Sequence, residues 1–196
     1  ISMVIYLHTT ESEKTAKVIV LQPNLDPYQE KYRLTNPQLL QLAKDITVET
    51  LNDKVDFLLT PEGYFDEGFG LNLSKYHLST FYQEINDFTT QYPNLSLVTG
   101  AQSFRLYPVS KKSPSETANQ LKNNAWYDVY NSVFHFQNNL TDNYYHKSKL
   151  VVGVEYMPYK KYLEPVIGEF LLDFGGTIAT RGIQKNRTVF VNKKGI

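Results

Sequence analysis

Short apolar runs alternate with amphipathic stretches over the first half of the chain. The runs at 16–21 and 55–59 are rich in Val, Leu and Ile, and they predict two short buried strands. The stretches at 37–53 and 79–91 instead repeat apolar residues every third or fourth position, which predicts helices that pack one face on a sheet. Strands and helices therefore alternate along this part of the chain.

The middle of the chain carries longer apolar patterns. Residues 95–106 predict a long strand broken at Gly100, and the alternation at 129–137 predicts another strand. Between them, residues 107–124 are rich in Ser, Lys, Pro and Asn and predict an exposed loop. Strand, helix, strand, helix, strand is an α/β order, so we expect that fold class.

Several element boundaries are also predicted. Asn36 before Pro37 has the signature of a helix start, and Leu78 is expected to begin the apolar stripe of the second helix. Near the end, 162–174 predicts a short or broken helix followed by a Gly175-Gly176 turn. Residues 188–191 predict a strand that leads into a hairpin turn at 192–195.

The first residues form a separate feature. Residues 1–7 are apolar but too few to span a bilayer, which takes roughly 20 residues. The polar stretch that follows would suit a linker, so we interpret 1–14 as the end of a membrane helix with its linker, and 15–196 as one soluble domain. A core strand at 1–7 is the alternative.

Composition narrows the function classes. The chain has 196 residues, with 20 basic against 20 acidic side chains, a balance that does not favour binding to nucleic acid. It has no Cys, and its four His lack the spacing of metal ligands, so neither a metal nor another cofactor is expected.

Two stretches carry candidate chemistry. Residues 145–158 place Lys147 and Glu155 on either side of an apolar run and a possible bend at Gly153, so both side chains can face one pocket. Glu62 follows the predicted strand 55–59, at the end where α/β sheets gather functional groups. An exposed turn with solvated charges and an ordinary loop carboxylate are the alternatives.

Three segments together resemble a known family. They are Leu21-Gln22-Pro23-Asn24-Leu25-Asp26-Pro27 with Glu30-Lys31, then Leu59-Thr60-Pro61-Glu62, then Tyr145 to Pro158. They resemble the nitrilase superfamily, and within it the periplasmic domain of apolipoprotein N-acyltransferase. The resemblance implies a nitrilase-like four-layer α-β-β-α sandwich over residues 15–196, incomplete at the C-terminal side.

The resemblance also implies roles for individual residues. Glu62 matches the general base, Lys147 the lysine that stabilises an oxyanion, and Glu155 the second glutamate. Lys147 precedes Glu155 by eight positions, as in the family, which makes Lys149 the weaker candidate. The aromatic residues near Glu62 (Tyr64, Phe65 and Phe69) could line the mouth of such a pocket, with Tyr64 and Phe65 as candidate substrate contacts, and packing in the core is the favoured alternative.

The chain departs from the family in two places. The family's nucleophilic Cys is missing, and relatives carry it shortly beyond the position of Ile196, so we interpret the chain as a fragment that is inactive by itself. Val152-Gly153-Val154 stands where many relatives have Pro-Phe-Gly, which leaves the local turn geometry open.

The function implied is acyl transfer through a thioester. The donor would be a phospholipid and the acceptor the N-terminal cysteine amine of an apolipoprotein, with the parent anchored in the bacterial inner membrane and this domain facing the periplasm. Two alternatives remain open: a soluble amidase of the same superfamily, and a catalytically dead nitrilase-like module that binds a partner.

Overall fold

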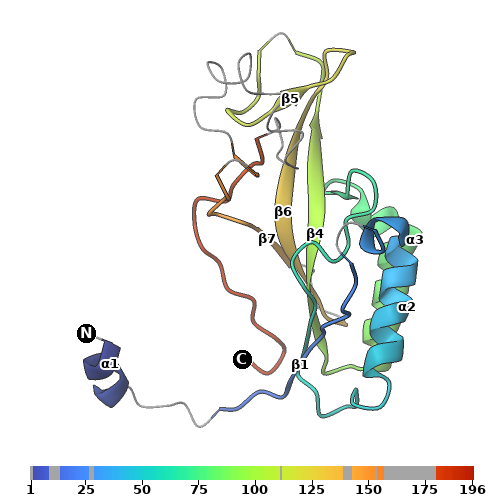
Figure 1. Cartoon of the computed structure of the whole chain (residues 1–196), viewed down its shortest axis with the longest axis vertical. Helices are drawn as coiled ribbons and strands as arrows, with labels where there is room; N and C mark the ends of the chain where they lie inside the picture. Colours follow the sequence, from blue (N-terminus) through green and yellow to red (C-terminus); the bar gives the residue numbers. More distant parts are fainter. Residues whose placement is uncertain are drawn as a thin grey trace.

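A single sheet flanked by two helices forms the body of the protein (Figure 1). The computed structural model describes residues 2–8, 14–26, 29–110, 112–138, 143–152, 154–156 and 180–196. Within these ranges the sheet has seven strands in the order β1-β2-β4-β6-β5, with β3 beside β4 and β7 beside β6. The strands are β1 (Val18–Val20), β2 (Phe57–Leu59), β3 (Leu71–Asn72), β4 (Ser96–Tyr107), β5 (Asn119–Gln120), β6 (Trp126–Phe136) and β7 (Asn143–His146). The helices are α1 (Ser2–His8), α2 (Asn36–Thr47) and α3 (Thr80–Gln91), with single 3-10 turns η1 (Lys31–Arg33) and η2 (Tyr76–Leu78).

The parallel strands β1, β2 and β4 set the α/β character. They pair in parallel and in register, with Val20 opposite Leu59 and Leu59 opposite Val98. Each successive strand is added on the same side of the previous one, and crossovers of one hand then place both helices on one face. Figure 1 shows α2 and α3 side by side on that face. The predicted α/β fold class is confirmed.

The long strands β4 and β6 form an antiparallel ladder that runs from Leu97 opposite Phe136 to Tyr107 opposite Trp126. The predicted break at Gly100 is wrong, because Gly100 keeps its place in this ladder opposite Val133.

Helix α2 begins one residue earlier than predicted. The cap is Thr35, whose hydroxyl accepts from the Gln38 N–H at 3.4 Å, while the Gln38 side chain accepts from the Thr35 N–H at 2.8 Å. Asn36 was expected to be the cap, but it is the first helical residue. The helix was predicted to end near residue 53, but it ends at Thr47. The Thr47 hydroxyl donates to Ala43 O, and a turn follows.

Helix α3 matches its prediction except at the start. Ser79 caps it by accepting from the Tyr82 N–H at 3.1 Å, and Phe81, Ile85 and Phe88 are buried against the sheet. Leu78 lies before the cap, in η2, and is 69% exposed, so its predicted place on the stripe is wrong.

The two faces of the sheet have different surroundings. Leu58, Leu97 and Phe134 point into the core under the helices and are almost fully buried. On the other face, Leu59, Val98 and Val133 are only partly buried, and Val18 and Val20 on β1 are 44% and 71% exposed, whereas Ser96 and His135 are buried. Two layers are therefore present in the described residues, one of helices and one of sheet.

The C-terminal segment 180–196 runs along the face opposite the helices (Figure 1). Phe190 contacts the ring of His135 at 5.4 Å between centroids, and Lys194 forms an ion pair with Asp56. The predicted strand 188–191 is wrong, since no ladder forms there among the described residues. The predicted turn is present, with the Gly195 N–H donating to Asn192 O at 2.9 Å.

The first residues form helix α1, so the alternative of a core strand at 1–7 is wrong. Its side chains Met3, Tyr6 and Leu7 are at least 74% exposed. None of the helices within the described ranges has the length and apolar character that a membrane crossing requires. The helix predicted at 162–174, the Gly175-Gly176 turn and the bend at Gly153 lie outside the described residues.

Candidate functional site

Glu62, Lys147 and Glu155 meet at one point although 93 positions separate the first from the last. Lys147 Nζ lies 2.8 Å from Glu62 Oε1 and 3.0 Å from Glu155 Oε2. The convergence expected from the sequence is therefore observed in the structure. The three side chains come from three separate segments, so the tertiary fold creates the cluster.

Glu62 is placed by the loop that leaves β2. Thr60, at the start of that loop, shares a 2.6 Å hydrogen bond between its hydroxyl and that of Thr99 on β4. The loop then crosses directly over Gly100, where a Cβ would lie 2.5 Å from Pro61 O and 2.7 Å from Glu62 Cα. Gly100 therefore allows a close approach of two backbones, which is why a glycine serves there.

Lys147 directly follows β7. Its backbone N–H donates to Asn131 O at 2.8 Å, which extends the pairing of β7 with β6 by one residue. The lysine side chain therefore starts from a fixed point of the sheet edge and reaches the loop that carries Glu62.

Glu155 is held by a tight turn that includes Val151. The Glu155 N–H donates to Val151 O at 2.9 Å, and the Val151 N–H donates to Glu155 Oε2 at 2.9 Å. The Glu155 carbonyl also accepts from the Arg181 N–H at 3.0 Å. Backbone groups thus fix both the main chain and the carboxylate of this residue.

Asn131 is a member of the cluster that the sequence analysis missed. Its side-chain Nδ2 donates to Glu62 Oε1 and, at 2.9 Å, to Glu155 Oε1. The only signal in the sequence is that Asn131 precedes Val133 by two positions on a strand, so that the two share a face. A polar residue in that register is common, and its two carboxylate partners are distant in sequence.

The contacts between Glu62 and Lys147 lower the pKa of the glutamate and raise the pKa of the lysine. The hydrogen bond from Lys147 lowers the pKa of Glu62, and the bond from Asn131 adds to this against the opposing effect of burial. Burial acts to lower the pKa of Lys147, but its bonds to Glu62 and Glu155 prevail and raise it. At neutral pH the glutamate is therefore ionised and the lysine protonated.

Glu155 is also ionised, despite being only 7% exposed. Burial acts to raise the pKa of Glu155, but hydrogen bonds from Asn131, the Val151 N–H and Lys147 outweigh it, so the pKa is lowered. A buried carboxylate keeps its charge when donors surround it in this way.

A cavity of about 340 Å³ adjoins the cluster. Its apolar wall comes from neighbouring strands on the face of the sheet away from the helices, with Leu59, Val98 and Val133 as members. Glu62, Lys147, Asn131, Thr60, Gly100 and Tyr145 complete the lining. The cavity can therefore place an apolar group beside an ammonium and a carboxylate.

Tyr64 and Phe65, the candidate substrate contacts, do not line this cavity and instead pack in the core, which was the favoured alternative. They are 2% and 1% exposed, and the Phe65 ring packs edge-on against Phe81 of α3 at 4.7 Å between centroids. The Tyr64 hydroxyl donates to Leu39 O of α2 at 2.9 Å. The chain after Glu62 runs beside β4, with Phe65 opposite Ala101, and this directs both aromatic rings into the core under the helices.

Lys149 has an exposed side chain, two residues beyond Lys147. The described part of the chain contains no group of three His, Asp or Glu side chains arranged to hold a metal ion.

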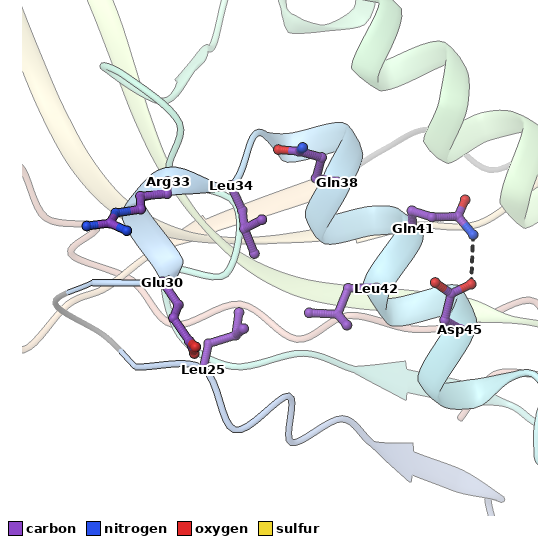
Figure 2. A pocket seen from close by; sticks show the side chains of 8 residues that line it. All are labelled: Leu25, Glu30, Arg33, Leu34, Gln38, Gln41, Leu42 and Asp45. Atoms are coloured by element: carbon purple, nitrogen blue, oxygen red, sulfur yellow. Dashed lines mark hydrogen bonds between the residues drawn. The ribbon is translucent and has the colours of Figure 1, made fainter.

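A larger cavity of about 560 Å³ lies elsewhere, between the loop after β1 and the outer side of α2 (Figure 2). Leu25, Leu34 and Leu42 line it, and its rim includes Asp45, which accepts a 2.8 Å hydrogen bond from Gln41. Glu30, Arg33 and Asp45 also line it, but the described residues form no ion pair there. The smaller cavity, which adjoins ion-paired side chains, is therefore the candidate site.

Comparisons with known proteins add little. No family model matches the chain, and no protein of established function matches it by sequence. A solved structure that matches is the glutamine-dependent NAD+ synthetase from Acinetobacter baumannii in complex with adenosine diphosphate, with a TM-score of 0.31 and 14% identity. The match covers 76% of this chain and 21% of the synthetase, so the chain spans about a fifth of that protein's length. A TM-score this low supports neither a shared fold nor a shared function.

Proposed function

We propose that this chain belongs to a nitrilase-like acyl-transfer domain of the apolipoprotein N-acyltransferase type. The observation that carries the proposal is the Glu62–Lys147–Glu155 cluster beside a cavity with an apolar wall. A carboxylate and an ammonium held together beside an apolar surface are the groups that cysteine-based acyl transfer requires.

The proposed chemistry has two steps. A cysteine sulfur attacks the ester carbonyl of a phospholipid, Lys147 stabilises the oxyanion, and Glu62 takes the thiol proton and returns it to the departing alcohol. The lipoprotein amine then attacks the thioester, Glu62 takes a proton from the amine, and the cysteine thiol is regenerated. Glu62, with its lowered pKa, is a weak base, so the positive charge of Lys147 must also favour the thiolate.

The cysteine is not among these 196 residues. In the proposal it follows shortly after the position of Ile196, as it does in the family that the sequence resembles. The chain by itself would then hold the base and the oxyanion donor but no nucleophile, and it would not transfer acyl groups.

The substrate class fits the apolar wall of the cavity. Leu59, Val98 and Val133 offer an acyl chain a surface free of charge, next to the ammonium that would receive the carbonyl oxygen. In the proposal the donor is a membrane phospholipid, the acceptor is an apolipoprotein, and the parent protein is anchored in the bacterial inner membrane with this domain in the periplasm.

The four-layer sandwich belongs to the same proposal. Val18 and Val20 of β1 lie on the sheet face away from the core, because Ile19 between them packs against it, and a second sheet with its own helices would bury that open face. The described residues would then supply one half of the sandwich.

Acyl transfer by the sequence continued past Ile196 is the direct test. We expect a cysteine within about ten residues and transfer of a labelled acyl chain from phospholipid to a lipopeptide with an N-terminal cysteine. Ser, Ala or Gly in place of that cysteine would indicate a dead binding module. Hydrolysis of amides without transfer to the lipopeptide would indicate a soluble amidase instead.

Two lysine variants of the continued sequence sharpen the test. Lys147→Ala should lower the rate of transfer by about a hundredfold or more, as the loss of an oxyanion donor does. Lys149→Ala is the matched control, because Lys149 is exposed, and it should change the rate little. A normal rate for Lys147→Ala together with a collapse for Lys149→Ala would overturn the assignment.

A further inference from the structure

We propose that Asn131 is the positioning residue of this site: its side-chain amide holds Glu62 and Glu155 together as two ionised carboxylates beside one lysine. Asn131 Nδ2 donates to Oε1 of each glutamate, and the bond to Glu155 is 2.9 Å long. The description of Glu62 as a base rests on the proposed function, whereas the charge arrangement does not.

The charges of the cluster explain why such a residue is needed. Glu62 and Glu155 carry two negative charges, and among the residues that the structure describes Lys147 is the cation that forms ion pairs with them. Two carboxylates at this range repel each other, and without further donors one of them would take up a proton. The NH₂ group of Asn131 supplies a donor to each, so both can remain ionised.

The oxygen atoms of the two glutamates are used differently. Both oxygens of Glu155 accept bonds, Oε1 from Asn131 and Oε2 from Lys147 and the Val151 N–H. For Glu62, both bonds fall on Oε1, and no described residue donates to Oε2. The side chain of Glu62 is 64% exposed and that of Glu155 only 9%. Asn131 therefore helps to separate an anchored carboxylate from one with an oxygen available to accept a proton.

Asn131 can do this because its own backbone is fixed. It lies in the interior of β6, opposite Gln102 of β4, and its carbonyl accepts from the Lys147 N–H at 2.8 Å. A side chain on a rigid strand keeps its direction better than one on a loop.

The other charged groups near Asn131 do not replace it. Asp66 and Arg181 line a hollow of about 50 Å³ together with Asn131, Gly63 and Gln102. Asp66 forms an ion pair with Lys31 at 2.8 Å, which balances its charge. Arg181 approaches the cluster through its backbone N–H, which donates to Glu155 O.

The first test uses the unmodified chain, labelled with ¹³C in its glutamate carboxyl groups and ¹⁵N in its asparagine amides, in an NMR titration. We expect the side-chain amide signal of Asn131 to move together with the carboxyl signals of Glu62 and Glu155, because it donates to both. The amide of Asn143, an exposed residue of β7, should not follow them. An Asn131 signal that does not respond to these carboxyls would overturn the proposal.

The second test uses two variants that remove the donors. Asn131→Asp and Asn131→Leu should each raise the titration midpoint of one carboxyl of the pair by about one pH unit or more. Asn143→Asp adds the same charge to the neighbouring strand and should leave both midpoints unchanged. Unchanged midpoints in the folded Asn131 variants would contradict the proposal, and if neither variant folds, the titration of the unmodified chain decides.

Activity measurements separate the two proposals. In the continued sequence, Asn131→Leu should lower kcat more than it changes KM and should move the acid limb of the pH profile to higher pH. The Asn131 amide signal could follow the two carboxyl signals while the continued sequence transfers no acyl groups. That result would support the positioning role of Asn131 and reject the proposed function. Acyl transfer by the continued sequence, together with an Asn131 amide signal that does not follow the carboxyl signals, would support the proposed function and reject the positioning role.

Discussion

Glu155 is the charged residue of the cluster that depends most on its surroundings. It is 7% exposed, and its carboxylate has three donors: Asn131, Lys147 and the Val151 N–H. Because its pKa is lowered in the folded state, its charge contributes stability at pH values above the ordinary glutamate pKa. That contribution is lost as the pH falls through the lowered value.

Glu155→Gln should therefore destabilise the chain by about 1–3 kcal/mol at pH 7, since bonds to a buried charge are lost. The difference from the unmodified chain should shrink in acid, because protonation then removes the same charge from Glu155. Chemical denaturation at pH 7 and near the acid limit of folding measures both. Glu49→Gln, which removes an exposed carboxylate after α2, is the control and should have little effect. A difference that grows toward acid would contradict a lowered pKa for Glu155.

Gly100 is the residue on which the position of Glu62 depends. A Cβ at this position would lie 2.6 Å from the Gly63 nitrogen and 2.7 Å from Glu62 Cα. Gly100→Ala should thus cost about 1–3 kcal/mol, as overpacking does, and should push the Glu62 loop away from Lys147. Thermal unfolding measures the first effect, and loss of the linked titration of Glu62 measures the second. Wild-type stability in the alanine variant would show that the loop can shift freely.

Helix α2 shows how one element depends on its first turn. Thr35 and Gln38 bond to each other's backbone N–H groups, and Pro37 pre-sets the backbone of the first turn. The helix has 12 residues and a buried stripe that includes Leu39 and Leu40, so packing supplies most of its stability while the cap sets where it starts.

Thr35→Ala should lower the free energy of unfolding by about 1 kcal/mol through loss of the cap. Thr90→Ala is the matched control, because Thr90 lies exposed within α3, where alanine is the better helix former. Urea denaturation of both variants measures the difference. Equal effects would show that the capping box contributes nothing.

The whole molecule has an open edge as well as an open face. Strand β1 is the outer strand of the sheet within the described residues, and Val20 on it is 71% exposed. Unpaired N–H and C=O groups beside apolar side chains favour pairing with another chain.

The purified chain should therefore self-associate as its concentration rises. Val20→Lys should reduce this, because a charge on an edge strand opposes pairing. Val109→Lys is the control, since Val109 is similarly exposed at 66% but lies after β4 rather than on the edge. Light scattering over a concentration series measures the effect. A strict monomer at high concentration would contradict the prediction.

The sequence by itself determined the alternation of strands β1, β2, β4 and β6 with helices α2 and α3, and its resemblance to a known family singled out the three charged residues of the candidate site. Apolar periodicity reports which side of an element is buried, and this is a local property, so α3 and the strands β1, β2 and β6 were found close to their places. Glu62 could be placed because the loop after β2 leaves the carboxyl end of a parallel strand.

Only the tertiary structure decided which other residues join them. Asn131 contacts Glu62 and Glu155, which are 69 and 24 positions away, and no local pattern encodes such a contact. Gly100 looked like a strand break until the Glu62 loop was seen to cross it, and Tyr64 could be assigned to the core only once α2 lay over it. Long-range packing chooses between such alternatives, because each is compatible with the local sequence and only the global arrangement of the chain distinguishes their energies.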